Sequence, residues 1–163
     1  MATNPHLLVI GYGNTLRRDD GVGPLVVESV GGLCLPGVRT LISQQLSPEH
    51  SAPVSQAHTV IFVDASVDAP HEVRLRPLAP GHCSQIMAHA ADPATILALA
   101  RDVFGHAPDA WWLTIPAMNL DFNEELSPET RAGAGEALRR IQSIAEQFCR
   151  EHGKNCEAVA NIS

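Results

Sequence analysis

Lysine is almost absent from this sequence. Lys154 is the single lysine among 11 basic residues, which face 18 acidic ones and leave a net charge of −7. A protein that follows a nucleic-acid backbone needs a basic face, so this composition argues against binding to DNA or RNA. Long apolar runs are missing too, because no stretch approaches the ~18 residues of a membrane span, and no basic leader precedes the first apolar stretch. We therefore expect a cytoplasmic protein without membrane insertion.

Paired cysteine motifs are also missing. The four cysteines show no CxxC spacing, which excludes a zinc knuckle and a thioredoxin-type motif. With 163 residues, 45% of them hydrophobic, the chain has the length and composition of one soluble domain. We expect residues 1–153 to form a single α/β domain and residues 154–163 to be a disordered C-terminal tail.

Strand-like and helix-like segments alternate along the chain. The expected strands are short apolar or β-branched runs, and they cover residues 7–10, 38–43, 59–63, 72–78 and 110–115. The expected helices begin after glycine, Ser-Pro or Asp-Pro signals, and they cover residues 25–30, a segment from 47, residues 94–104 and residues 128–152. This alternation predicts an α/β fold: a single-domain three-layer sandwich with a mainly parallel, twisted sheet of about five strands and helices on both faces.

A polar loop follows the first expected strand. Its supporting residues are Gly11, Gly13, Asn14, Asp19 and Gly21. The loop is not a dinucleotide-binding fingerprint, because Leu16 stands where the third glycine is needed. Acids just before the next helix would also repel a pyrophosphate from its N-terminus.

Three side chains are candidates for chemistry. Asp20 and Asp19 are adjacent acids, so one can cap the following helix while the other faces the strand ends, where ligands of parallel sheets bind. Asp64 ends the most strongly apolar strand, which we expect at the centre of the sheet; a simple turn is its alternative role. His89 precedes a Pro-led helix, and alone it is typical of a solvated residue. Two carboxylates and one imidazole would suit a borderline divalent ion such as Zn²⁺ or Ni²⁺ if the fold brought them together.

These motifs, taken in order, resemble those of a known family. The matching segments are Gly11-Tyr12-Gly13-Asn14-Thr15-Leu16, Asp19-Asp20-Gly21-Val22-Gly23, Val63-Asp64-Ala65, Ala88-His89 before a Pro-led helix, and Leu126-Ser127-Pro128-Glu129. The chain resembles the hydrogenase maturation proteases, endopeptidases that trim the large subunit of nickel–iron hydrogenases. The resemblance runs from residue 7 to about residue 140, so it covers nearly the whole sequence.

The resemblance implies a function and a site. Asp20, Asp64 and His89 match the family's metal-contacting positions, so it implies that they recognise nickel already inserted in the precursor of the large subunit. Cleavage then removes a C-terminal extension from that precursor. Nickel is supplied by the substrate, and zinc or another divalent ion is expected to substitute. Either a metal-bound water or the carboxylate of Asp20 or Asp64 could start hydrolysis.

Two alternatives remain at this point. A nickel-binding chaperone or sensor would use the same three ligands without hydrolysis. A peptidyl-tRNA-hydrolase-like esterase would share the Gly-x-Gly-Asn strand end, but in that family proline follows the asparagine. Here Thr15 follows it, no His-Asn pair exists, and the charge of −7 disfavours tRNA.

Overall fold

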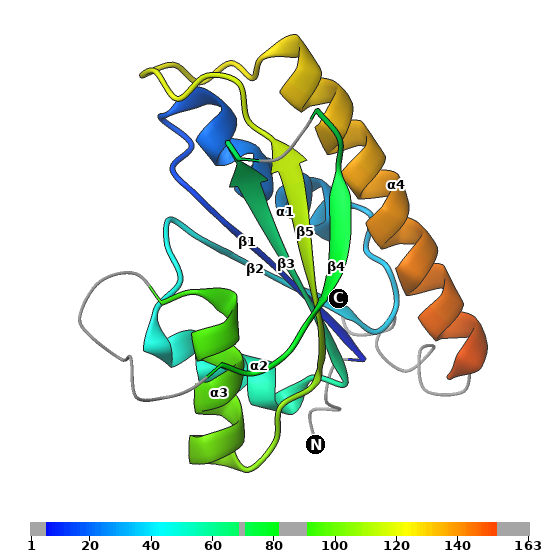
Figure 1. Ribbon diagram of the computed structural model, residues 1–163. Helices are drawn as coiled ribbons and strands as arrows, with labels where there is room; N and C mark the ends of the chain where they lie inside the picture. Colours follow the sequence, from blue (N-terminus) through cyan, green and yellow to red (C-terminus); the bar gives the residue numbers. More distant parts are fainter. Residues whose placement is uncertain (1–5, 69–70, 82–90, 153–163) are drawn as a thin grey trace.

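The computed structural model describes residues 6–68, 71–81 and 91–152 (Figure 1). Its strands are β1 (Leu7–Tyr12), β2 (Val38–Ser43), β3 (Thr59–Ser66), β4 (Arg74–Leu78) and β5 (Asp109–Pro116). Its helices are α1 (Val22–Gly32), α2 (Ser51–Gln56), α3 (Pro93–Phe104) and α4 (Pro128–Glu151), with short 3₁₀ turns η1 (Arg18–Gly21) and η2 (Pro48–His50). The expected tail 154–163 lies outside the described residues. Within them, no helix is long and apolar enough to cross a membrane.

The sheet order is β2-β1-β3-β5-β4, and only the edge strand β4 runs antiparallel to its neighbour. The chain passes from β1 to β2 on one side and then crosses back to β3 on the other side of β1. A crevice for ligands is expected where the strand order reverses in this way, at the carboxyl ends of β1 and β3.

Helices cover both faces of the sheet (Figure 1). On one face, alternate residues of β1 and β3, such as Val9 and Ile61, pack with α1 and α4. On the other, Ile10 and Phe62 pack with α2 and α3. Because each fully buried Leu, Ile or Phe side chain contributes about 1.5–3 kcal/mol, these two apolar layers are the main source of stability. The predicted three-layer α/β sandwich is confirmed.

The helix signals in the sequence act as expected at most positions. Asp92 caps α3 by accepting a hydrogen bond from the Thr95 amide at 2.7 Å. Gly105 ends the same helix in the left-handed conformation, with φ of 80°. The helix predicted at 25–30 is longer and starts at Val22. The segment predicted from 47 is a 3₁₀ turn that continues into the single short helix α2.

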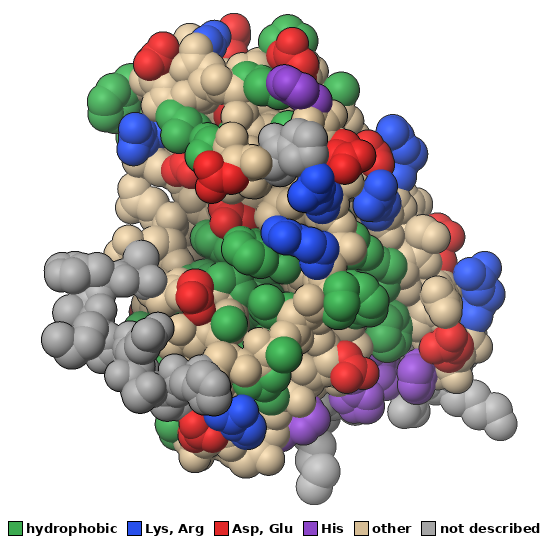
Figure 2. All heavy atoms as spheres, viewed as in Figure 1, with side chains coloured by type: hydrophobic (Ala, Val, Ile, Leu, Met, Phe, Trp, Pro, Cys, Tyr) green, Lys and Arg blue, Asp and Glu red, His purple; other side chains and the backbone are tan. Residues whose placement is uncertain are grey.

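A histidine cluster lies at the amino end of the sheet, away from the predicted crevice. The ring of His6 lies 5.1 Å from that of His58 and 5.2 Å from that of His152. Histidine side chains gather along the lower edge of the molecule in Figure 2. In the sequence, His6 and His58 precede expected strands and His152 ends the last expected helix. Nothing local predicts a cluster of residues that lie 52 and 94 positions apart.

Candidate functional site

The candidate site lies where β1 and β3 separate. Their pairing ends at Gly11 and Val63, but β3 remains paired with β5 from Asp64 to Ser66. The strand predicted at 59–63 is therefore three residues longer than expected, and Asp64 lies inside it rather than at its end. Continued pairing with β5 keeps the backbone of Asp64 extended, while the departure of β1 leaves its other edge free.

Asp64 and Tyr12 form the central contact of this crevice. The Tyr12 hydroxyl donates a hydrogen bond of 3.0 Å to Oδ2 of Asp64. Burial raises the pKa of Asp64 to about 6, and the negative charge of Asp20 adds to the rise. Hydrogen bonds from Tyr12 and the Ala65 amide oppose that rise. Burial and the charge of Asp64 also raise the pKa of Tyr12, so its hydroxyl remains a neutral donor.

Asp20 is brought to the same crevice by the loop after β1. Its Oδ2 accepts a hydrogen bond of 2.8 Å from the Asn14 amide. The loop can fold this closely because position 13 is a glycine. Its φ is 145°, which other residues rarely adopt, and a Cβ there would collide with the Asp20 carbonyl oxygen. At the start of α1, a Cβ on Gly23 would lie 2.5 Å from the Val63 carbonyl oxygen. These two glycines let the loop and α1 approach β3, and so place Asp20 near Asp64.

Asp19 has a different role from the cap that its position suggests. Neither acid caps α1, since the cap position is Gly21 and it receives no side-chain hydrogen bond. Instead the buried Asp19 carboxylate accepts hydrogen bonds from the amides of Met118, Asn119 and Ser127 at 2.7, 2.8 and 2.7 Å. Burial alone would raise the pKa of Asp19, but the hydrogen bonds outweigh it and lower that pKa. Asp19 does not cap α1 because η1 turns its side chain inward, toward the loop before α4.

The structure describes two of the three predicted metal ligands. Asp20 and Asp64 interact electrostatically across the crevice, whereas His89 lies outside the described residues. Across residues 6–68, 71–81 and 91–152, no group of three or more His, Cys, Asp or Glu side chains could hold a metal ion. The carboxylate pair has the oxygen donors that a divalent cation accepts, and it would need a third ligand from elsewhere.

Two polar residues near the site, Tyr12 and Thr114, were not predicted from the sequence to have a role there. Tyr12 lies two positions after the buried Ile10, so the alternation of the strand places both on one face. Thr114 pairs with Asp64 in register, is buried, and its hydroxyl has no hydrogen-bond partner in the described part of the chain. Both are polar residues in the last three positions of a mainly apolar strand, which is the signal that could have identified them.

No protein-family model and no curated protein matches this sequence. Solved structures do match it. The hydrogenase maturating endopeptidase HybD from E. coli has a TM-score of 0.68 and 21% identity, over 91% of this chain and 94% of its own. The [NiFe] hydrogenase maturation protease HycI from Thermococcus kodakarensis KOD1 has a TM-score of 0.68 and 19% identity, over 87% of this chain and 93% of its own. A hydrogenase 2 maturation peptidase from the Thaumarchaeota archaeon SCGC_AB-539-E09 has a TM-score of 0.62 and 21% identity, over 85% of this chain and 97% of its own.

This chain has the fold of the hydrogenase maturation proteases. The fold implied by the sequence resemblance is thus confirmed over most of the chain. In this maturation-protease fold, the crevice between β1 and β3 holds the Asp20–Asp64 pair.

Proposed function

We propose that this protein is an endopeptidase that removes the C-terminal extension of a nickel-loaded precursor of a nickel–iron hydrogenase large subunit. Asp20, Asp64 and His89 recognise the nickel bound to that precursor. The observation that carries the proposal is the carboxylate pair at the topological switch point, where burial and then the charge of Asp20 raise the pKa of Asp64. The shared fold with maturation endopeptidases supports the same reaction class.

The electrostatics of the pair favour a cationic substrate. Two partly buried carboxylates close together repel each other, so a bare peptide gains little there. A peptide that presents a divalent cation relieves this repulsion and gains binding energy from coordination. Recognition of this kind acts as a checkpoint, because only a precursor that already carries nickel obtains that energy.

Hydrolysis needs a water molecule that loses a proton as it attacks the scissile carbonyl carbon. One route uses an ionised carboxylate, Asp20 or Asp64, as the general base. In this route Tyr12 keeps Asp64 oriented through its hydrogen bond. In the other route, the nickel carried by the substrate polarises the carbonyl or the water. Both routes place the scissile bond close to the Asp20–Asp64 pair.

The test is cleavage of a nickel-loaded precursor, followed by mass spectrometry of the large subunit. We expect the loss of one C-terminal peptide, and no loss with a nickel-free precursor. Asp20→Asn, Asp64→Asn and His89→Gln should each slow cleavage by about 100-fold or more, the range for losing a positioned acid–base group. Asp68→Asn is the matched control, since Asp68 is an exposed carboxylate four residues after Asp64.

Two outcomes would contradict the proposal. If the precursor stays intact while the free protein binds nickel tightly and stoichiometrically, the protein is a nickel chaperone or sensor. If Asp20→Ala and His89→Ala together leave cleavage unchanged, the assigned site is wrong.

A further inference from the structure

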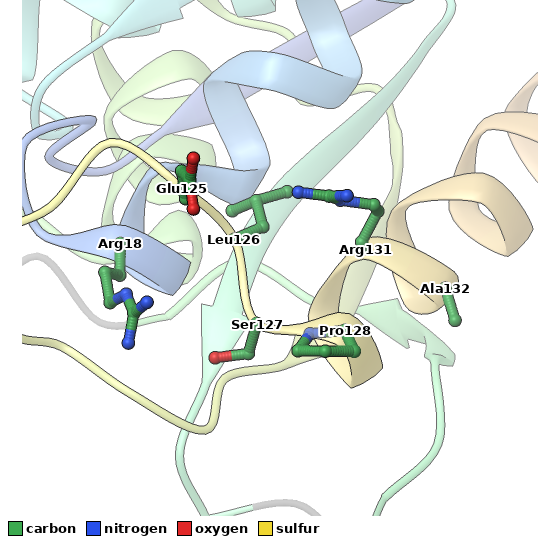
Figure 3. Close-up of a pocket in the computed structure, with 7 residues that line it drawn as sticks. All are labelled: Arg18, Glu125, Leu126, Ser127, Pro128, Arg131 and Ala132. Carbon is green, nitrogen blue, oxygen red and sulfur yellow. The ribbon is translucent and has the colours of Figure 1, made fainter.

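A second feature lies beside the crevice, at the start of α4. Seven residues line a pocket of about 570 Å³: Arg18, Glu125, Leu126, Ser127, Pro128, Arg131 and Ala132. Figure 3 shows Arg18 on η1 and Arg131 on the first turns of α4, on either side of the segment that contains Leu126 and Ser127. The pocket thus carries two guanidinium groups against the one carboxylate of Glu125, on a protein with a net charge of −7.

Neither arginine of this pocket forms an ion pair with another described residue. The ion pairs among the described residues involve other arginines, on β4, α3 and α4. The Nε atom of Arg18 is buried and has no hydrogen-bond partner in the described part of the chain. A buried donor without an acceptor costs free energy, so an anion that accepts from it would be stabilised.

The backbone holds Arg18 at the pocket wall in an unusual conformation. Its φ is 44°, in the left-handed region that non-glycine residues rarely adopt. Two backbone hydrogen bonds enforce it, from Arg18 N to Asn123 O at 2.7 Å and from Asp19 N to Asn119 O at 3.1 Å. The neighbouring Asp19 carboxylate binds the Ser127 amide. The two sides of the pocket are therefore tied together.

The start of α4 contributes a partial positive charge to the pocket, which the Asp19 carboxylate at the Ser127 amide and Glu129 in the first turn offset in part. Ser127 makes no side-chain cap to α4, a helix of 24 residues. The amide groups of its first turn and its dipole favour negative charge. This contribution accompanies the two arginines and does not stand alone.

We propose that this pocket binds a carboxylate side chain of the polypeptide substrate and thereby selects which precursor is cleaved. The inference rests on the proposed function. A polypeptide is the occupant because Arg18 lies two residues from Asp20 in the same 3₁₀ turn. The apolar side chains Leu16 and Phe122, which are 55% and 84% exposed, lie on the same two tied loops and offer further contacts to an extended chain.

The test compares Arg18→Gln and Arg131→Gln with Arg139→Gln, an exposed arginine on α4 outside the pocket. Each pocket variant should raise KM and the Kd for nickel-loaded precursor about tenfold, as expected for the loss of one charge-assisted hydrogen bond. The value of kcat should stay within about twofold, because neither arginine is one of the proposed acid–base or metal-contacting groups. Arg139→Gln should change neither constant. Since Arg131 is exposed, its variant is expected to fold.

The partner residue is found by replacing, one at a time, each acidic residue of the precursor near the cleaved bond with its amide. One replacement should raise KM for the unmodified protein and cause no further rise with Arg131→Gln. Unchanged KM and Kd in both pocket variants would overturn the inference. Arginine-dependent binding without cleavage would instead overturn the proposed hydrolysis and leave the pocket assignment intact. Neither binding nor cleavage by the unmodified protein would overturn both.

Discussion

Tyr12 opposes the effect of burial on the ionisation of Asp64. Its hydroxyl is the one side-chain donor that Asp64 receives within the described chain, at 3.0 Å, and it lowers the pKa of a carboxyl group that burial raises. The effect of Tyr12 is indirect, so it is a positioning residue. It stabilises the ionised form of Asp64, which the proposed coordination or base catalysis would use.

Replacing Tyr12 with Phe removes this donor and keeps the ring. We expect the pKa of Asp64 to rise further above about 6, because the remaining burial and the Asp20 charge both favour its neutral form. Carbon-13 NMR titration of the metal-free protein measures that pKa directly. Cleavage by Tyr12→Phe should fall more at pH 6 than at pH 8, because fewer molecules have Asp64 ionised at the lower pH.

The control for this experiment is Phe148→Leu, on the far end of α4, which should leave the Asp64 titration unchanged. If Tyr12→Phe lowers the pKa of Asp64, or reduces cleavage equally at both pH values, the indirect role is wrong.

At the scale of elements, η1 joins the first loop to the segment before α4. The join depends on one buried side chain, Asp19, which accepts three backbone hydrogen bonds. This contact places Asp20 for the crevice and Arg18 for the pocket at the same time. An element of four residues thus connects the two proposed binding features.

Asp19→Asn retains the size of the side chain but replaces one acceptor oxygen by an NH₂ group that faces amide donors. We expect a loss of about 2–3 kcal/mol in the free energy of unfolding, the value of a lost charged hydrogen bond plus an unsatisfied buried donor. Urea denaturation at pH 7 measures it. Asp121→Asn, an exposed carboxyl on the adjoining loop, should cost under about 0.5 kcal/mol.

The stabilisation by Asp19 should also depend on pH, in a definite direction. The folded-state pKa of Asp19 is lowered, so its stabilisation is present above its unfolded pKa and is lost as the pH falls through the folded value. The unmodified protein should therefore lose stability on acidification below pH 4 more steeply than Asp19→Asn. Parallel acid profiles for the two proteins would contradict this account.

At the scale of the whole molecule, the two ends of the sheet carry different chemistry. The carboxyl end holds the acidic crevice, and the amino end holds His6, His58 and His152. His6 is 9% exposed, and its Nδ1 has no hydrogen-bond partner in the described part of the chain. Burial first, and then the charges of His58 and His152, lower the pKa of His6.

A lowered histidine pKa makes stability depend on pH in a definite direction. Between the folded pKa of His6 and its ordinary value of about 6.5, the unfolded chain binds more protons, so stability rises with pH across this window. His6→Gln should flatten the difference in Tm between pH 5.5 and pH 7.5, measured by differential scanning fluorimetry. The exposed His71→Gln should keep the slope of the unmodified protein. An unchanged slope in His6→Gln would assign the pH dependence to other groups.

The order of the elements was predictable from the sequence because local signals agree with the tertiary structure. The apolar run 7–10, the β-branched run 59–63 and the Ser-Pro and Asp-Pro helix starts all lie in the expected elements. Trp111 and Trp112 also face opposite layers as the alternation requires, although both are only partly buried. These features depend on neighbours within a few residues, so local sequence patterns are sufficient to predict them.

Local patterns in the sequence are enough to predict the alternating elements, the two-sided burial of the central strands and the candidate acids Asp20 and Asp64. Tertiary structure alone decided that β1 separates from β3 just before Asp64, that Asp19 anchors a loop about 100 residues away, and that Arg18 and Arg131 share a pocket. The physical reason is distance along the chain. Contacts between residues about 50 to 115 positions apart depend on strand order and packing, which no local propensity specifies.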